Sequence, residues 1–209
     1  MSVFSSILKK FFKTETIYFS HYLSIDGWLT EQEAKGLKEV AALLPKKSVV
    51  VEIGSWKGKS TWCIAHGLKK GTINCIDPFN AAGEEGSKEL YKKTQGETSL
   101  IEQFRNNIKD APASATIKTH QGYSSDFIGS IHQIDFLFID GDHSIEGCKF
   151  DFENFAHELK PGGFLAFHDY YPDRHELGPT WVIDELVRKS DQFTHVKDYD
   201  SLCVFRKNS

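Results

Sequence analysis

The sequence predicts an α/β protein with a doubly wound, mostly parallel seven-stranded sheet and an antiparallel hairpin at its C-terminal edge. Three observations carry this prediction. Short apolar runs alternate with helical patterns along most of the chain. The first run ends in a turn that contains Gly54 and Gly58 and leads into a helix. The last two runs are joined by a short link at residues 198–201, which is typical of a hairpin.

Local patterns place the elements in order. Thr30 and Glu33 match a capping box, so we expect a helix that starts there and stops before Pro45. Residues 80–97 are polar and rich in glycine, which predicts a long loop beside the functional site, and residues 160–163 (Lys-Pro-Gly-Gly) predict a turn. The apolar runs predict strands at residues 49–53, 72–76, 115–120, 134–139, 164–167, 195–197 and 202–205, and helical patterns begin near residues 60, 99, 123, 144 and 181.

Length and composition limit the functional class. A chain of 209 residues can bury one sizeable core, so we expect an N-terminal helical segment (residues 1–45) followed by one cofactor-binding domain (residues 46–209). The formal charge of -4 gives no basic footprint for nucleic acid. The four cysteines are scattered without a Cys-x-x-Cys pattern, which favours a reducing cytoplasm over a zinc site or a disulfide framework.

The N-terminal segment carries its own expectation. Residues 3–13 are apolar and basic, and no stretch of the chain approaches the ~20 apolar residues of a membrane span. We expect this segment to pack on its own domain or on a partner subunit, which would make a homodimer. The alternative is an amphipathic helix that lies on a membrane surface.

Acidic residues stand at the carboxyl ends of four predicted strands, where ligands bind in open α/β sheets. They are Glu52, Asp77, Asp140 and Asp169. The spacing of Gly54 and Gly58 differs from the Gly-x-Gly-x-x-Gly expected for a dinucleotide, so we expect a cofactor with an amino-acid head and a ribose. Asp77 follows this turn by about twenty residues, the offset at which an acid hydrogen-bonds a ribose diol. At Gly54 we expect that a side chain would collide with the cofactor.

On these residues the chain resembles the class I S-adenosylmethionine-dependent methyltransferases, which have a Rossmann-like fold. Residues 52–60 are similar to the family's first motif, and residues 159–163 to its turn before strand five. Residues 138–144 and 167–170 are similar to a bacterial subgroup that includes macrocin-type O-methyltransferases. The resemblance implies S-adenosyl-L-methionine as cofactor, bound by Glu52, Gly54, Ser55, Trp56, Ser60, Asp77, Gly122, Tyr123, Ser124 and Asp140.

The resemblance also implies an activity, the O-methylation of a small-molecule hydroxyl on a sugar or glycoside. We expect His143 to act as the general base, because a neutral histidine accepts protons near pH 7, with Asp140 as the second catalytic residue. Asp142 is expected to cap the next helix. Acceptor specificity would lie in the first forty residues, in residues 80–97 and in residues 170–178.

A metal ion is implied by the metal-dependent members of the family, in which acids after strands four and five hold one divalent cation. Here the corresponding residues are Asp140, His168 and Asp169. Oxygen ligands suit magnesium, whereas the imidazole of His168 suits manganese better. Two carboxylates at adjacent strand ends repel each other, so something must offset the repulsion. The alternatives to a metal are that one of the carboxylates is protonated, or that His168 is charged and neutralises the pair.

Two other functional classes are left open. A cofactor-binding or assembly module could keep this fold without turnover. A nicotinamide-dependent oxidoreductase is disfavoured, because the dinucleotide glycine spacing is missing and neither Tyr123 nor Tyr170 has a lysine four residues on.

Overall fold

The strands form one mixed sheet in the order β3-β2-β1-β4-β5-β7-β6, and this confirms the predicted fold class. The structure, a computed structural model, describes residues 18, 20–83 and 88–209, so the apolar basic segment at residues 3–13 lies outside the described residues. Strands β1 to β5 run parallel, and β7 is antiparallel to both of its neighbours. The strands are β1 (Ser48–Ile53), β2 (Gly71–Asp77), β3 (Ala115–Gln121), β4 (Ile134–Ile139), β5 (Leu159–Phe167), β6 (Phe193–Tyr199) and β7 (Leu202–Lys207).

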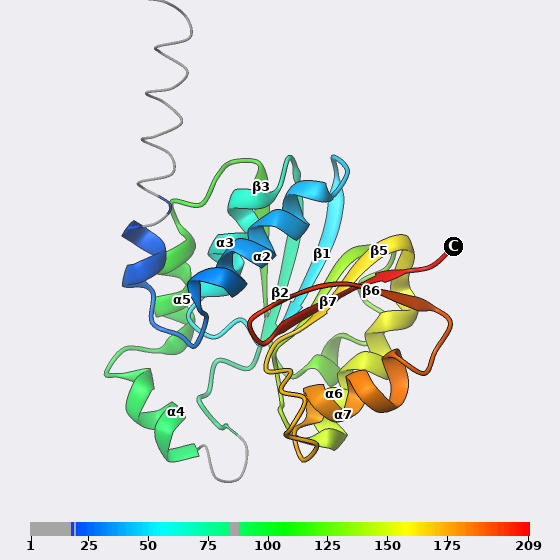
Figure 1. The fold of residues 1–209 in the computed structure, drawn as a ribbon. Helices are drawn as coiled ribbons and strands as arrows, with labels where there is room; N and C mark the ends of the chain where they lie inside the picture. The colour runs from blue at the N-terminus through cyan, green and yellow to red at the C-terminus, as the bar shows by residue number, and fades with distance from the viewer. Residues whose placement is uncertain (1–17, 19, 84–87) are drawn as a thin grey trace, which may run out of the picture.

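Helices cover both faces of the sheet (Figure 1). On one face lie α2 (Glu31–Leu43), α3 (Lys59–Gly67) and α5 (Leu100–Ile108), and on the other lie α6 (Ile145–Phe155) and α7 (Gly178–Val182). Each face has its own core: Trp62 and Phe104 are fully buried on the first, Phe155 and Val182 on the second. The alternation of strands and helices therefore produces the two-sided burial that makes β1 and β4 almost entirely apolar.

The start of α2 is fixed by the predicted capping box. The Thr30 hydroxyl accepts a hydrogen bond from the Glu33 amide, and the Glu33 carboxylate accepts one from the Thr30 amide. The helix packs Leu37 and Ala41 into the first core, and its C-cap residue Leu44 is buried there too. Tyr18 and Ile25 are buried in that core too, so the described part of the N-terminal segment lies on the sheet domain.

Some local predictions were wrong. Residues 80–97 contain a helix, α4 (Lys88–Gln95), because Lys, Glu and Leu form a helix readily even where, as here, none of them is buried. The expected turn at residues 160–163 lies inside β5, where Gly162 adopts a φ of 80° and the pairing with β4 shifts register. The pattern Pro-Gly-Gly therefore marks a bulge in a strand instead of a turn before it. The helix expected from residue 123 is the single 3-10 turn η1 (Ser124–Phe127), and α7 continues into a π-helical turn, η3 (Ile183–Val187).

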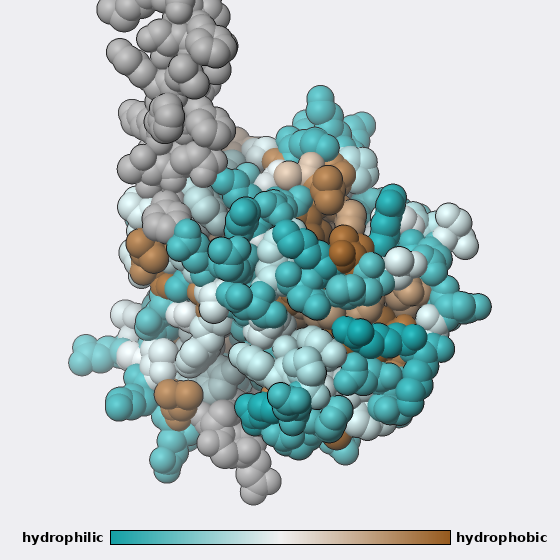
Figure 2. All heavy atoms as spheres, viewed as in Figure 1, coloured by the Kyte–Doolittle hydropathy of each residue, from teal (hydrophilic) through white to brown (hydrophobic). Residues whose placement is uncertain are grey.

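The surface seen in Figure 2 is mostly hydrophilic, and its hydrophobic residues form separate small patches. None of the described helices has the length and apolar character needed to cross a membrane. All four cysteines are buried as free thiols.

Candidate active site

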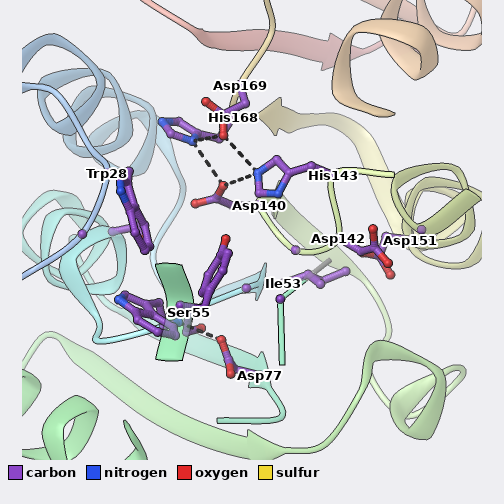
Figure 3. Close-up of a pocket in the computed structure, with 18 of the residues that line it drawn as sticks. Trp28, Ile53, Ser55, Asp77, Asp140, Asp142, His143, Asp151, His168 and Asp169 are labelled. Atoms are coloured by element: carbon purple, nitrogen blue, oxygen red, sulfur yellow. Dashed lines mark hydrogen bonds and ion pairs between the residues drawn. The ribbon is translucent and has the colours of Figure 1, made fainter. Parts of the chain in front are cut away.

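A cavity of about 870 Å³ opens at the carboxyl ends of β1, β2, β4 and β5. The strand order reverses between β1 and β4, and ligands bind at such a switch point in open α/β sheets. Figure 3 shows Asp77, Asp140, His143 and Asp169 around this cavity. Of the predicted cofactor residues, eight line it: Gly54, Ser55, Trp56, Ser60, Asp77, Tyr123, Ser124 and Asp140.

The glycine turn after β1 is held against the loop after β4. Gly54 has a φ of 87°, and a Cβ atom built on it would lie 2.0 Å from the backbone oxygen of Asp140. A side chain at Gly54 would therefore collide with the protein's own backbone. This contact alone requires a glycine here, whether or not a cofactor is bound. Gly58, with a φ of 85°, precedes α3, and its Cβ would lie 2.9 Å from Ile108 of α5. Both glycines thus allow the turn to pack closely.

Glu52 lies beneath the turn and does not line the cavity. Its carboxylate accepts hydrogen bonds from the hydroxyls of Ser55 (2.9 Å) and Thr61. Complete burial raises the pKa of Glu52, and these hydroxyls oppose the shift. Glu52 therefore ties the turn to the first turn of α3 from below. Gly122, another predicted cofactor residue, also lies outside the cavity lining.

Asp77 faces the cavity with a carboxylate that is fixed from behind. Oδ2 accepts the Trp56 amide at 2.8 Å, and Oδ1 accepts the Phe79 amide at 2.6 Å. Burial raises the pKa of Asp77, while the two amides lower it. Trp56, Phe79 and Ala81 have positive φ angles of 46°, 52° and 51°. Such backbone strain persists where the surrounding structure fixes it, and it concentrates at functional sites.

The carboxylate of Asp169, after β5, and the imidazole of His143, in the loop after β4, lie side by side in the cavity. Asp169 Oδ2 lies 3.0 Å from His143 Nε2, and Asp140 Oδ1 lies 3.8 Å from the same nitrogen. Burial alone would raise the pKa of Asp169, but hydrogen bonds from His143 and His168 hold it well below its ordinary value. Asp169 itself has a positive φ of 59°, which directs its side chain back into the cavity toward the residues after β4.

His168 lies behind these groups and is surrounded by carboxylates. Its Nδ1 lies 3.2 Å from Asp140 and 3.3 Å from Asp169, and its Nε2 lies 3.1 Å from Glu33. Burial lowers the pKa of a histidine, but the three carboxylates raise that of His168 far above its ordinary value. His168 is therefore an imidazolium that offsets the repulsion between Asp140 and Asp169 (Figure 3).

This charge bears on the predicted metal ligands. Asp140, His143 and Asp169 offer ligand atoms that lie within 4.8 Å of one another. An imidazolium has no lone pair for a metal, so His168 does not fit the role of a ligand in this arrangement. The positive charge that a metal would bring between the two carboxylates is already supplied by the protein.

Three segments expected to set acceptor specificity all reach the cavity. Trp28 comes from the N-terminal part of the chain, Leu90 and Tyr91 from residues 80–97, and Tyr171 from residues 170–178. The rings of Trp28, Trp56 and Tyr91 have centroids 5.1–5.7 Å apart and form an aromatic wall. Five of the large hydrophobic residues that are exposed to solvent line this cavity: Trp28, Leu90, Tyr123, Phe150 and Tyr171.

Sequence reasoning missed two acids of the cavity wall. Glu33 was assigned only to a helix cap, and Asp151 of α6 was not singled out. Both are buried charges on the apolar face of a helix, and that placement is the signal that could have found them. The prediction that Asp142 caps the helix after β4 was wrong. Ser144 caps α6 through its hydroxyl, and Asp142 accepts a hydrogen bond from the Ser144 amide.

Known proteins resemble this chain in sequence and fold. Residues 51–170 match the protein family described as "Methyltransferase domain". The uncharacterized protein y4gI of Sinorhizobium fredii (strain NBRC 101917 / NGR234) is 26% identical over 168 residues, which cover 77% of this chain and 17% of that protein. This chain therefore spans only a small part of the curated relative's length.

Two solved structures show how widely the fold is used. The O-methyltransferase TomG from Streptomyces achromogenes, crystallised with S-adenosylmethionine, has a TM-score of 0.61 and 17% identity over 87% of this chain and 82% of that chain. An rRNA methylase from Streptococcus thermophilus has a TM-score of 0.58 and 13% identity over 88% of this chain and 100% of that chain. At these identities the likeness is one of fold, and it does not identify the acceptor.

Proposed function

This chain belongs to the methyltransferase domain family, and on that premise we propose that it transfers a methyl group from S-adenosyl-L-methionine to a hydroxyl of a small molecule, a sugar or glycoside. The observation that carries the proposal is the pair formed by His143 and Asp169. His143 Nε2 lies 3.0 Å from Asp169 Oδ2, and both side chains line the same cavity as Asp77 and the glycine turn. The residues that we assign to the general base and to the cofactor site thus line one cavity.

The residues around the turn fit the cofactor. Ser55 and Ser60 line the cavity beside the first turn of α3. The backbone N–H groups of that turn have no hydrogen-bond acceptor within the helix. The serine hydroxyls and these N–H groups suit the carboxylate of an amino acid. Asp77, already oriented by two amides, suits a ribose diol. When bound, S-adenosylmethionine supplies a methyl group on a positively charged sulfur.

The acceptor hydroxyl must lose its proton as its oxygen forms a bond to the methyl carbon and the carbon–sulfur bond breaks. We assign that proton to His143. Asp169 then stabilises the imidazolium that forms, and Asp140 lies 3.8 Å from the same ring nitrogen. Holding the hydroxyl in line with the methyl group accounts for a large part of the acceleration, on the order of 7–11 kcal/mol.

The proposed reaction requires no metal ion. The support is the imidazolium of His168, which lies within 3.3 Å of both carboxylates and carries the compensating charge. With the pair neutralised in this way, Asp140 and Asp169 serve to orient His143 and the acceptor hydroxyl.

The aromatic wall of Trp28, Trp56 and Tyr91 supports a ring-shaped acceptor. Apolar ring faces stack on such side chains, and the carboxylates opposite can accept hydrogen bonds from hydroxyls. This combination suits a sugar ring, and the acidic character of the cavity disfavours an anionic acceptor.

A binding experiment separates this proposal from the other classes. Titration calorimetry should detect S-adenosylhomocysteine and not NAD, and binding of NAD alone would indicate an oxidoreductase. Labelled S-adenosylmethionine incubated with a panel of sugars and glycosides should then yield a methylated product. His143→Ala should abolish this transfer and leave S-adenosylhomocysteine binding unchanged. Binding without transfer to any acceptor would favour a module without turnover.

A further inference from the structure

Asp151 is a buried acid that the proposed reaction does not use. It lies on α6, lines the cavity, and is only 3% exposed. The Ser124 hydroxyl donates a hydrogen bond to its Oδ1. Among the described residues no basic side chain forms an ion pair with it, and its charged neighbour is another acid, Asp142. A buried carboxylate without a cation is costly to keep, and a hydrogen-bond donor on a ligand in the cavity would lower that cost.

The second oxygen of Asp151 lies beside Gly141. Oδ2 lies 3.2 Å from the point that a Cβ on Gly141 would occupy, and Gly141 is itself a cavity residue. Figure 3 shows Asp142 and Asp151 together on the wall beside Ile53, across the cavity from Trp28. A side chain at Gly141 would crowd this oxygen, and the glycine leaves that space free.

The position of Asp151 relates it to the base of the proposed cofactor, and this step rests on the proposed function. The amino-acid end is assigned to the turn after β1 and the ribose to Asp77 after β2. Ser124 follows β3, the next strand in the sheet, so the base extends from Asp77 toward Ser124 and its partner Asp151. The adenine ring carries an exocyclic amine, which is a donor, beside a ring nitrogen that is an acceptor.

We propose that Asp151, held by Ser124, accepts a hydrogen bond from the exocyclic amine of the cofactor's adenine and makes the site specific for adenine over a 6-oxo purine. A 6-oxo purine presents a carbonyl oxygen at the position of the amine. That oxygen would face a carboxylate, and neither group would have a donor for the other. Sites that hydrogen-bond a ligand group reject analogues lacking it strongly, because a buried polar group is then left unpaired.

The test compares two ligands that differ only at the purine edge. Titration calorimetry with S-adenosylhomocysteine and S-inosylhomocysteine should give at least about 100-fold tighter binding of the adenine compound to the wild-type chain. Asp151→Asn replaces a pure acceptor by a group that also donates, so the ratio should fall at least about tenfold. Ser124→Ala should lower the ratio of the two affinities by a smaller factor, since it removes the hydrogen bond that holds the Asp151 carboxylate.

Asp142→Asn is the matched control. It removes a charge from the same wall, but its Oδ1 still accepts the Ser144 amide, and the ratio should stay within about twofold of wild type. Equal binding of both ligands to the wild type, or an unchanged ratio in both Asp151→Asn and Ser124→Ala, would overturn the inference. If the wild type binds neither ligand, the proposed function itself fails and the assignment of Asp151 fails with it.

Discussion

Glu33 and His168 form a buried ion pair, with Oε2 of the carboxylate 3.1 Å from Nε2 of the imidazole. The same carboxylate accepts the Thr30 amide and, through Oε1, both the amide and the hydroxyl of Ser201. One side chain therefore joins the start of α2, the turn between β6 and β7, and the histidine behind Asp140 and Asp169. The capping residue of an N-terminal helix thus fixes part of the acidic cluster from behind.

Removal of the Glu33 carboxylate should be strongly destabilising. Glu33→Ala leaves the His168 imidazolium without its partner on one side, and breaking a buried ion pair in this way costs about 3–5 kcal/mol. Thr30→Ala removes the helix cap but keeps the ion pair, so we expect a loss of only about 1 kcal/mol. Urea denaturation of the two variants measures the difference, and equal losses would assign Glu33 to capping alone.

The contribution of Glu33 should also depend on pH. Burial would raise the pKa of Glu33, but the hydrogen bond and charge of His168 together with the other hydrogen bonds lower it to about 2 from 4.5. A carboxyl whose pKa is depressed on folding stabilises the fold above its ordinary pKa and loses that effect as pH falls through the folded value. The difference in unfolding free energy between wild type and Glu33→Ala should therefore shrink between about pH 4.5 and pH 2.

Gly54 and Gly96 offer a matched pair for the glycine turn. Both have a positive φ, 87° and 79°, but a Cβ at Gly54 would strike the Asp140 backbone whereas a Cβ at Gly96 would meet nothing within 4 Å. Gly96→Ala should cost about 1 kcal/mol from backbone strain. Gly54→Ala adds the collision, and about 3–5 kcal/mol is expected in thermal or urea unfolding. Similar costs at the two positions would contradict the close contact between the turns after β1 and β4.

Asp77→Ala should weaken S-adenosylhomocysteine binding by about 1–3 kcal/mol, the range for hydrogen bonds to a charged group. Because Asp77 also accepts the Trp56 and Phe79 amides, the variant must first be shown to be folded at the temperature of the titration. Asp110→Ala, which removes an exposed acid after α5 and outside the cavity lining, controls for a general loss of negative charge. Unchanged affinity in Asp77→Ala would refute the ribose assignment.

The sequence alone predicts the sheet and the strand-end acids well, for a physical reason. Buried parallel strands need continuous apolar runs, and ligands bind where those strands end, so Asp77, Asp140 and Asp169 are visible as acids after such runs. The pairing of Glu33 with His168 is not visible, because the two residues come from elements far apart in sequence. Glu33 is 135 positions before His168, and only folding places them 3.1 Å apart. Periodicity does carry a trace of this, since Glu33 and Asp151 interrupt apolar helix faces.

Chelation tests the role given to His168. If its imidazolium supplies the charge between Asp140 and Asp169, methyl transfer should be unchanged after dialysis against EDTA and unaffected by added magnesium or manganese. His168→Asn removes that charge, so it should lower kcat at least about tenfold while S-adenosylhomocysteine affinity changes little. Activity that is lost in EDTA and regained with manganese would instead assign Asp140, His143 and Asp169 to a metal site.

The acid that we assign to adenine recognition should weaken the fold at neutral pH. Burial raises the pKa of Asp151 from 3.8 to about 6, against the hydrogen bond from Ser124 and together with the charge of Asp142. A carboxyl whose pKa is raised on folding costs stability once it ionises, and the cost grows as pH rises from the unfolded to the folded value. Asp151→Asn removes the cost, so this variant should be more stable than wild type by at most about 3 kcal/mol at pH 7.5 and by about half as much at pH 5. Urea denaturation at the two pH values measures both differences.

A variant that is more stable than wild type but discriminates poorly between the two purines would identify Asp151 as an acid kept for binding at the expense of stability. A variant that is destabilised equally at both pH values would show that the carboxylate stabilises the fold.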